Sequence, residues 1–228
     1  DKDAYGYLQG VWVRSEENPI DLSDEKSFLD YISNVDSACY ESDLKYFRWN
    51  TVLDFQGKDE TLLHTIADRK EHQPEAISYY KDTSKTETTD SCSNFGSLQA
   101  IKVVKRNQSG VILELELDFQ NGAVSVQSEY NMRAILGCGI TNINLLDGSS
   151  VEMSILPSAY ISIQAKGDGT YAVLGGGYGH GIGMSQNGAQ KLCGHGFDYK
   201  RILNYFYQDT ELTELYQPQN VTKEEGGA

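Results

Sequence analysis

The segment from residue 175 to residue 183 constrains this chain most strongly, because all five odd positions in it are glycines. Glycine loses more conformational entropy on folding than any other residue, so such a run indicates unusual backbone dihedrals or the close approach of another backbone or a ligand. In an extended chain, alternate residues share one face. The pattern therefore predicts an extended segment with one face of bare main chain and an opposite face that carries Tyr178, His180 and Ile182.

The residues that follow the glycines predict the start of a helix. Ser185, Gln186 and Asn187 can cap a helix whose free N–H groups point back at the glycine run. A phosphate-binding loop is not indicated, because no G-K-[ST] follows and no G-x-G-x-x-G register fits. A tight turn packed beneath a helix stays an alternative. His180 lies between two glycines with no bulky neighbour to bury it, which makes a functional role as plausible as a structural one.

The composition argues against several classes of protein. With 19 Lys and Arg against 33 Asp and Glu, the net charge is −14, so binding to nucleic acid or to an anionic lipid surface by charge is not expected. Charged residues make up 23% and aromatic residues 11%, which excludes wholesale disorder. The 228 residues, 39% of them hydrophobic, suffice for one sizeable core or two small ones. The apolar stretches are too short for a transmembrane helix.

The first part of the chain has helical periodicity and many charges. Ser23 can cap a helix over residues 24–32, and a second helix is predicted over 59–70 with acidic residues in its first turn. Alternating apolar residues over 47–55 predict a strand between them. Residues 81–94 are polar and rich in Thr and Ser, which indicates a loop.

The second part changes to period two. Strands are expected over 101–106, 111–119 and 123–126, and Asn121-Gly122 is a strong hairpin signal between the last two. A helix that begins after Ser128 follows. The remaining expected elements are strands over 150–156, 160–165 and 170–174, a helix from Ser185 to Gly196, and a helix capped by Asp198 that turns Ile202, Leu203 and Phe206 inward. The fold class predicted is α+β, an antiparallel barrel-like β-sheet from about 49 to 174 with short flanking helices.

The glycine run resembles the signature of the stage II sporulation protein D family. Residues 177–186 read G-Y-G-H-G-I-G-M-S-Q and are followed by Gly188-Ala189. The family's run is approximately G-x-G-W-G-H-G-V-G-M-S-Q-x-G-A, so Tyr178 replaces the usual Trp and Ile182 replaces the Val. Weaker similarities extend over most of residues 40–215: the family's segments correspond to 46–49, 107–111, 133–137 and 196–207.

The resemblance implies a role in peptidoglycan processing. Members of the family are similar to lytic transglycosylases, which cleave the MurNAc–GlcNAc bond of peptidoglycan freed of stem peptides and leave an anhydro sugar. This chemistry needs a protonated carboxyl group, whose pKa is raised by burial. In this chain the resemblance assigns glycan binding to Gly177, Tyr178, Gly179, His180, Gly181, Gly183, Ser185 and Gln186.

The sequence departs from the family where the catalytic acid is expected. The family's E-M-P segment, which carries its Glu, and the A-Q-A-V-A-A-R-T-Y helix after it do not occur here. We therefore expect no catalytic residue in this chain, the acid lying upstream, or else a homologue that has lost its acid and only binds glycan. Glu129 is expected to pair with Arg133, and Asp198 to act as a helix cap. Residues 1–216 are expected to form one such domain, and 217–228 a tail.

The cysteines leave metal binding as a question. Some members of the family resemble zinc proteins, and Cys193-Gly194-His195 could be joined by Cys138. Structural zinc sites normally use two short ligand pairs, and the second pair is missing, so a Cys138–Cys193 disulfide or two buried thiols are favoured. His64 and His72 are expected at the surface. No metal and no cofactor are therefore predicted.

These observations rank three functions. The leading hypothesis is a peptidoglycan-processing, lytic transglycosylase-like domain outside the cytoplasmic membrane that binds glycan strands, with a cell-wall hydrolase as a possible partner. Its export signal is not in this chain and is expected to have been removed or to lie outside it. The alternatives are a non-catalytic wall-binding or scaffold module, and a metal-dependent hydrolase that uses His180, His195 and cysteines.

Overall fold

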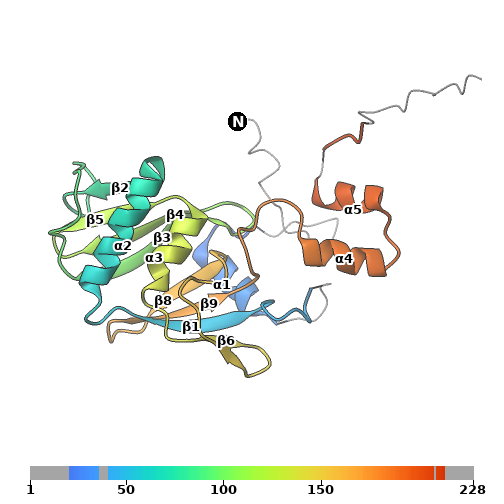
Figure 1. Cartoon of the computed structure of the whole chain (residues 1–228), viewed down its shortest axis with the longest axis horizontal. Helices are drawn as coiled ribbons and strands as arrows, with labels where there is room; N and C mark the ends of the chain where they lie inside the picture. Colours follow the sequence, from blue (N-terminus) through green and yellow to red (C-terminus); the bar gives the residue numbers. More distant parts are fainter. Residues whose placement is uncertain (1–20, 36–40, 208, 214–228) are drawn as a thin grey trace, which may run out of the picture. The chain divides into compact units, whose positions relative to one another are not determined.

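The structure is a computed structural model that describes residues 21–35, 41–207 and 209–213 (Figure 1). The chain divides into two compact units, Asp1–Gly183 and Met184–Ala228, and each is described by itself. The expected tail, 217–228, lies outside the described residues. That residues 1–216 act as one domain stays a prediction. None of the helices in the described ranges has the length and apolar character needed to cross a membrane.

The first unit contains two antiparallel sheets. The five-stranded sheet has the order β7 (Ser150–Val151), β6 (Ile143–Leu145), β1 (Trp49–Asp54), β9 (Thr170–Gly175) and β8 (Ile161–Ala165). The four-stranded sheet has the order β2 (Ile77–Tyr80), β5 (Gly122–Val126), β4 (Ile112–Phe119) and β3 (Leu98–Arg106). The meander β3–β4–β5 and its turn at Asn121-Gly122 confirm the period-two pattern.

The sheets do not close into a barrel, so the barrel-like part of the prediction is not confirmed. No strand pairing joins the two sheets within the described ranges. Where the edge strands β3 and β8 lie near each other, a side chain makes the contact instead of main-chain hydrogen bonds. The Arg106 guanidinium of β3 donates to the Ile161 carbonyl of β8 at 2.7 Å. An arginine between two edge strands occupies the space in which main-chain pairing would continue the sheet.

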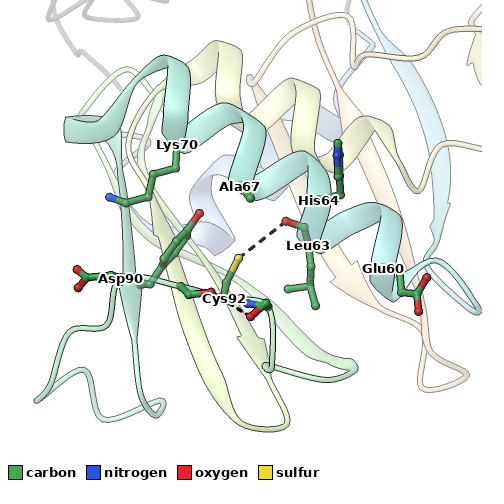
Figure 2. A pocket seen from close by; sticks show the side chains of 10 residues that line it. Glu60, Leu63, His64, Ala67, Lys70, Asp90 and Cys92 are labelled. Carbon is green, nitrogen blue, oxygen red and sulfur yellow. Dashed lines mark hydrogen bonds between the residues drawn. The ribbon is translucent and has the colours of Figure 1, made fainter.

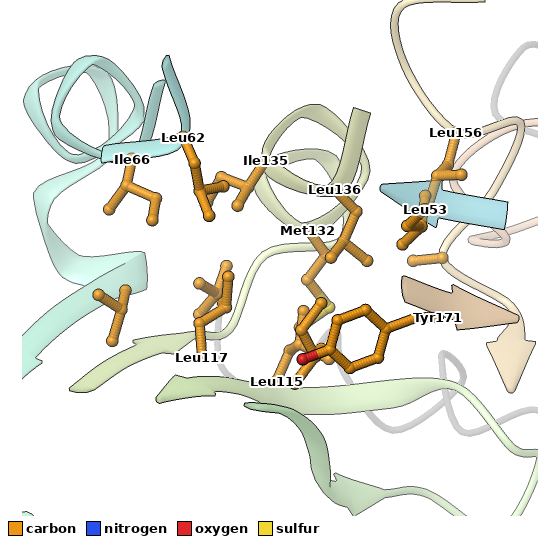
Figure 3. Close-up of a cluster of buried hydrophobic side chains, with 14 of the residues drawn as sticks. Leu53, Leu62, Ile66, Leu115, Leu117, Met132, Ile135, Leu136, Leu156 and Tyr171 are labelled. Carbon is orange, nitrogen blue, oxygen red and sulfur yellow. The ribbon is translucent and has the colours of Figure 1, made fainter. Parts of the chain in front are cut away.

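Two helices cover one face of the four-stranded sheet. Figure 1 shows α2 (Asp59–His72) and α3 (Glu129–Gly137) side by side above it. Figure 3 shows that their apolar residues point toward β4, where alternate leucines point back. The fully buried side chains of this core include those of Leu62, Ile66, Leu115, Leu117, Met132, Ile135 and Leu136. Strand β1 contributes Leu53 to the same core, so it ties the two sheets together.

Helix α1 (Glu25–Ser33) packs on the other face of the five-stranded sheet. Its Phe28 and Ile32 form a second cluster with Leu174 of β9, while the neighbouring strand residues face the main core. Asp24, and not Ser23 as predicted, is the N-cap of α1, because its carboxylate accepts from the N–H groups of residues 26 and 27.

The strand expected over 150–156 is much shorter. Pairing ends at Val151, and the chain then runs along α3, whose Arg133 side chain donates to the Leu156 carbonyl at 2.8 Å. A Cβ atom at Gly137 would lie 2.2 Å from the Ser154 carbonyl oxygen. The close packing of this segment on α3 therefore replaces a sheet partner. Strands β2 and β6 were not predicted.

The second unit contains α4 (Gln186–Gly194) and α5 (Tyr199–Phe206). Both expected caps are confirmed: the Ser185 hydroxyl accepts from the Gly188 N–H, and the Asp198 carboxylate accepts from the Arg201 N–H. No residue of α5 is fully buried within the described part of the chain. Residues 202, 203 and 206, predicted to turn inward, are half-buried.

Candidate functional site

The glycine run is not one extended segment, as predicted, but two segments with different geometry. Strand β9 carries the run as far as Gly175. Beyond it, the φ angles of Gly177, Gly179, Gly181 and Gly183 are +77°, +121°, +73° and +80°. Left-handed dihedrals at every second residue turn the chain repeatedly, and L side chains rarely adopt them. The predicted alternation of one bare and one side-chain face is therefore wrong for residues 177–183.

Gly175 and Gly176, which we call the packed segment, are glycines because neighbouring side chains lie against them. Gly175 pairs with Trp49 across the sheet, and a Cβ atom at Gly175 would lie 2.2 Å from Cζ2 of the indole. A Cβ atom at Gly176 would lie 3.0 Å from Nη1 of Arg48 and 3.0 Å from Cδ1 of Ile32. The packed segment thus belongs to the core.

We call residues 177–183 the open segment. Hydrogen bonds to two different parts of the chain hold the main chain at its beginning. The Trp49 indole N–H donates to the Gly177 carbonyl at 3.1 Å, and the Gly177 N–H donates to the Tyr46 carbonyl at 2.8 Å. On the other side, the Gly179 N–H donates to the Pro157 carbonyl at 2.9 Å. These bonds fix the beginning of the open segment before any ligand binds.

The open segment presents an aromatic ring beside bare main chain. Tyr178 is 65% exposed, and its ring lies against that of Tyr46, with centroids 4.8 Å apart and planes at 35°. Nζ of Lys45 lies 5.4 Å from the Tyr46 centroid. Cβ atoms built at Gly177, Gly179 and Gly181 would meet nothing within 4 Å. A ligand can therefore approach this main chain closely, and an aromatic surface lies next to it.

His180 is exposed, and its imidazole orientation is defined by the open segment itself. The Ile182 N–H donates to Nδ1 of His180 at 2.9 Å. An accepting Nδ1 places the proton of the neutral ring on Nε2. Nε2 therefore remains as the donor for a ligand.

The eight predicted site residues are divided between the two units. Those from Gly177 to Gly183 share the open segment. Ser185 and Gln186 lie at the beginning of α4 in the second unit, where Ser185 caps the helix. Their proximity to the glycines in space stays a prediction. Tyr46 and Trp49 belong to the site as well; the aromatic cluster at the start of β1 was the sequence signal for them.

The carboxyl groups singled out from the sequence have structural roles. Glu129 pairs with Arg133 at 3.2 Å, and Asp198 caps α5, as predicted. Burial acts to raise the pKa of Glu116, but Lys85 and Lys102 outweigh it, so this pKa is lowered. Hydrogen bonds from nearby Ser or Thr hydroxyl and main-chain groups lower the pKa of the remaining carboxyl groups with a clear shift, Asp21, Asp24, Asp82, Asp147 and Asp168. A general acid at neutral pH needs the opposite shift.

The cysteines do not form the predicted disulfide. Cys92, Cys138 and Cys193 are free thiols, and Cys39 lies outside the described residues. Cys138 is half-buried and donates to the Thr65 hydroxyl at 3.2 Å, whereas Cys193 is exposed in the second unit, so the two-buried-thiol alternative is also wrong. Among the described residues, no group of three or more His, Cys, Asp or Glu side chains is placed to hold a metal ion.

A separate pocket of about 480 Å³ lies between α2 and residues 90–93 (Figure 2). His64 and Glu60 stand along one side of it and Asp90 on the other, with Cys92 between them. Burial raises the pKa of the Cys92 thiol. Both His64 and His72 are exposed, as predicted. The predicted glycan-binding residues do not line this pocket.

Comparison with known proteins adds the following similarities. The chain is 34% identical over 89 residues to the amidase enhancer of Bacillus subtilis (strain 168), which covers 39% of this chain and 12% of that protein. It is 36% identical over 76 residues to stage II sporulation protein D of the same organism, which covers 33% of this chain and 22% of that protein. The match thus spans about an eighth and about a fifth of these relatives' lengths. The resemblance to stage II sporulation protein D is confirmed for part of the chain.

A family comparison covers more of the sequence. Residues 2–183 match the family described as "Domain of unknown function (DUF8618)". This match ends at the residue where the first compact unit ends. The chain therefore belongs to the DUF8618 family and carries within it a region similar to stage II sporulation protein D.

Proposed function

We propose that this chain binds the glycan strands of peptidoglycan on its open segment, as part of cell-wall remodelling outside the cytoplasmic membrane. The observation that carries the proposal is the exposed Tyr178 ring, which lies on Tyr46 next to main chain without side chains. A sugar ring has flat faces of C–H groups and a rim of hydroxyls. An aromatic face beside free peptide groups matches both features.

The hydrogen bonds at the start of the open segment support affinity. A loop that is ordered only on binding loses part of its interaction energy to that ordering. Here Trp49, Tyr46 and Pro157 hold the main chain at Gly177 and Gly179 in advance. His180 adds a donor, Nε2, for a hydroxyl or acetamido oxygen.

The names of the two relatives support a role for this binding in the cell wall. One is named an amidase enhancer and the other a sporulation protein. We extend to this chain a place beside a cell-wall hydrolase, with lytic transglycosylase-like cleavage as the reaction it serves. Within that reaction we assign the glycan-binding surface to this chain and the acid to another segment. Among the described residues, Glu129 and Asp198 are engaged as an ion pair and a cap.

Binding can be tested by co-sedimentation of the chain with insoluble peptide-free glycan strands. Tyr178→Ala should weaken binding by roughly tenfold, because ring stacking contributes about 1 kcal/mol or more. Tyr199→Ala is the matched control, since Tyr199 is 66% exposed but lies in the second unit. Equal binding by both variants would refute the assignment of the open segment. Release of anhydro sugars by the chain alone would refute the assignment of the acid to another segment.

A further inference from the structure

The pocket between α2 and residues 90–93 takes no part in the proposed function. Its volume is about 480 Å³, and no residue of the open segment lines it (Figure 2). The α2 residues that line it recur at helical spacing from Glu60 to Lys70, so they share one face of the helix. A helix rises about 1.5 Å per residue, which makes this stretch roughly 15 Å long. The pocket can therefore hold several residues of an extended chain.

The floor of the pocket is apolar and is held in place by its own contacts. Tyr79 and Cys92 are 4% and 3% exposed, and Leu63 lines the pocket with them. The Cys92 thiol donates to the Leu63 carbonyl at 3.8 Å, and the Phe95 N–H donates to the Cys92 carbonyl at 3.1 Å. These bonds hold the 90–93 segment against α2. A preformed apolar floor accepts an aliphatic side chain and loses little binding energy to ordering.

The two ends of the pocket carry carboxylates. Glu60 lies at the end where α2 begins, and Figure 2 shows Asp90 toward the other end, on the side of Lys70. Both acidic residues are exposed, and neither has an ion-pair or side-chain hydrogen-bond partner within the described ranges. The Lys70 ammonium group donates to the carbonyls of Pro74 and Ile77, at 3.1 Å and 2.6 Å. Its charge weakens the negative potential at the Asp90 end but does not pair with Asp90.

We propose that this pocket docks a linear segment of a partner protein in which an apolar side chain lies between two basic ones. In an extended segment, residues i, i+2 and i+4 point to the same side, and the outer two are about 13 Å apart. The pattern basic–x–apolar–x–basic therefore places its cations at the two carboxylates and its apolar side chain on the floor. The net charge of −14 favours the approach of such a segment.

This inference does not depend on glycan binding, because the pocket and the open segment share no residue. Failure of one proposal therefore leaves the other standing. A chain that binds glycan strands and none of the peptides described below would lose only the docking pocket.

Three peptides test the proposal by NMR titration of the amide resonances. They are acetyl-Lys-Ala-Leu-Ala-Lys-amide, the same peptide with both lysine side chains acetylated, and the same peptide with serine in place of leucine. The first should shift resonances of α2 and of residues 90–93. It should bind roughly tenfold more tightly than the acetylated peptide, because two exposed ion pairs are formed. It should also bind roughly tenfold more tightly than the serine peptide, because the apolar contact is kept.

High salt separates the two contributions in the wild-type chain. Screening should reduce the preference for the charged peptide over the acetylated one. The preference for leucine over serine should stay, because an apolar contact does not depend on charge.

Three variants locate the charges that the peptide meets. Glu60→Gln should reduce the preference for the charged peptide by about threefold, and Asp90→Asn by less, because Lys70 already lies at that end. Glu71→Gln is the matched control, since Glu71 is exposed on the same helix but does not line the pocket. It should leave the preference unchanged. All three replace exposed side chains, so the fold should persist.

The proposal fails if the lysine peptide does not bind, if it binds no more tightly than the acetylated one, or if the shifts lie outside the pocket. It also fails if Glu71→Gln lowers the preference as much as Glu60→Gln. Free hexylamine serves as a last probe. Binding as tight as that of the lysine peptide would identify a site for small amines and would refute a partner segment.

Discussion

The packed and open segments consist of the same residue type in one continuous run, yet they need glycine for opposite reasons. At Gly175 and Gly176, side chains of the core occupy the volume in which a Cβ atom would lie. At Gly177, Gly179 and Gly181 that volume is empty, and the left-handed φ angle is what excludes other residues. A glycine pattern alone therefore does not tell whether a segment is buried or exposed.

The two segments also differ in what they contribute: the packed segment to the stability of the fold, and the open segment to ligand binding. The packed segment is part of the main core through Trp49, which lies against Gly175 and also holds the Gly177 carbonyl. The open segment contributes little buried surface, since Tyr178 and Ile182 are 65% and 48% exposed. Substitutions in the first segment should unfold the protein, and substitutions in the second should act on the ligand.

The largest effect is expected for Gly175→Ala. The added methyl group would overlap the buried Trp49 ring, and overpacking of a core costs about 3 kcal/mol or more at the severe end. Gly181→Ala is the matched control, because its methyl group enters open space and only the left-handed φ costs about 1–2 kcal/mol. Urea denaturation measures both. Equal destabilisation would remove the distinction between the two segments.

Trp49→Phe should have the next largest effect on stability, and it should affect both the packed and the open segment. The smaller ring leaves a cavity beside Gly175, and the Gly177 carbonyl loses its donor, which together cost about 2–4 kcal/mol. Glycan binding should weaken as well, because the open segment is no longer held in advance. A variant that is destabilised but binds glycan with unchanged affinity would contradict the role of Trp49 in fixing the open segment.

Gly179→Val should reduce the stability of the protein less than Trp49→Phe does, and should reduce glycan binding more. Its φ of +121° is unfavourable for a β-branched residue, a strain of about 1–3 kcal/mol. The valine side chain would also stand over the bare main chain and exclude a sugar ring. We expect a folded protein by circular dichroism that no longer sediments with glycan strands. Retained glycan binding would show that the ligand lies elsewhere.

The smallest effects are expected for substitutions of His180. They test whether Nε2 of the ring serves the ligand while Nδ1 supports the loop. Asn can replace the Nδ1 acceptor that holds the Ile182 N–H, whereas Gln places a donor where Nε2 lies. His180→Gln should therefore keep more glycan affinity than His180→Asn, with the stability of both within about 0.5 kcal/mol of wild type, as for most surface changes. The reverse order would mean that His180 acts by supporting the loop.

Much of the fold could be predicted from local patterns. The meander and its Asn121-Gly122 turn follow from strict alternation, and α2 follows from helical periodicity with acidic residues in its first turn. Strands β2 and β6 were missed because four and three residues are too few for a recognisable period. Where the two sheets meet, Arg106 donates to the Ile161 carbonyl, a contact between distant residues that periodicity does not contain.

The site was predictable in its residues but not in its geometry. The glycine spacing identified the segment, and alternation was interpreted as a strand, whereas the positive φ angles make it a series of turns. The Cys138–Cys193 pairing failed for a similar reason, since spacing alone contains no information on which residues face each other.

Hydrogen–deuterium exchange with and without peptide-free glycan strands tests the central claim most directly. We expect slowed exchange in peptides that cover residues 177–183, with no change around the pocket between α2 and residues 90–93. Unchanged exchange in 177–183, together with protection at that pocket, would contradict it.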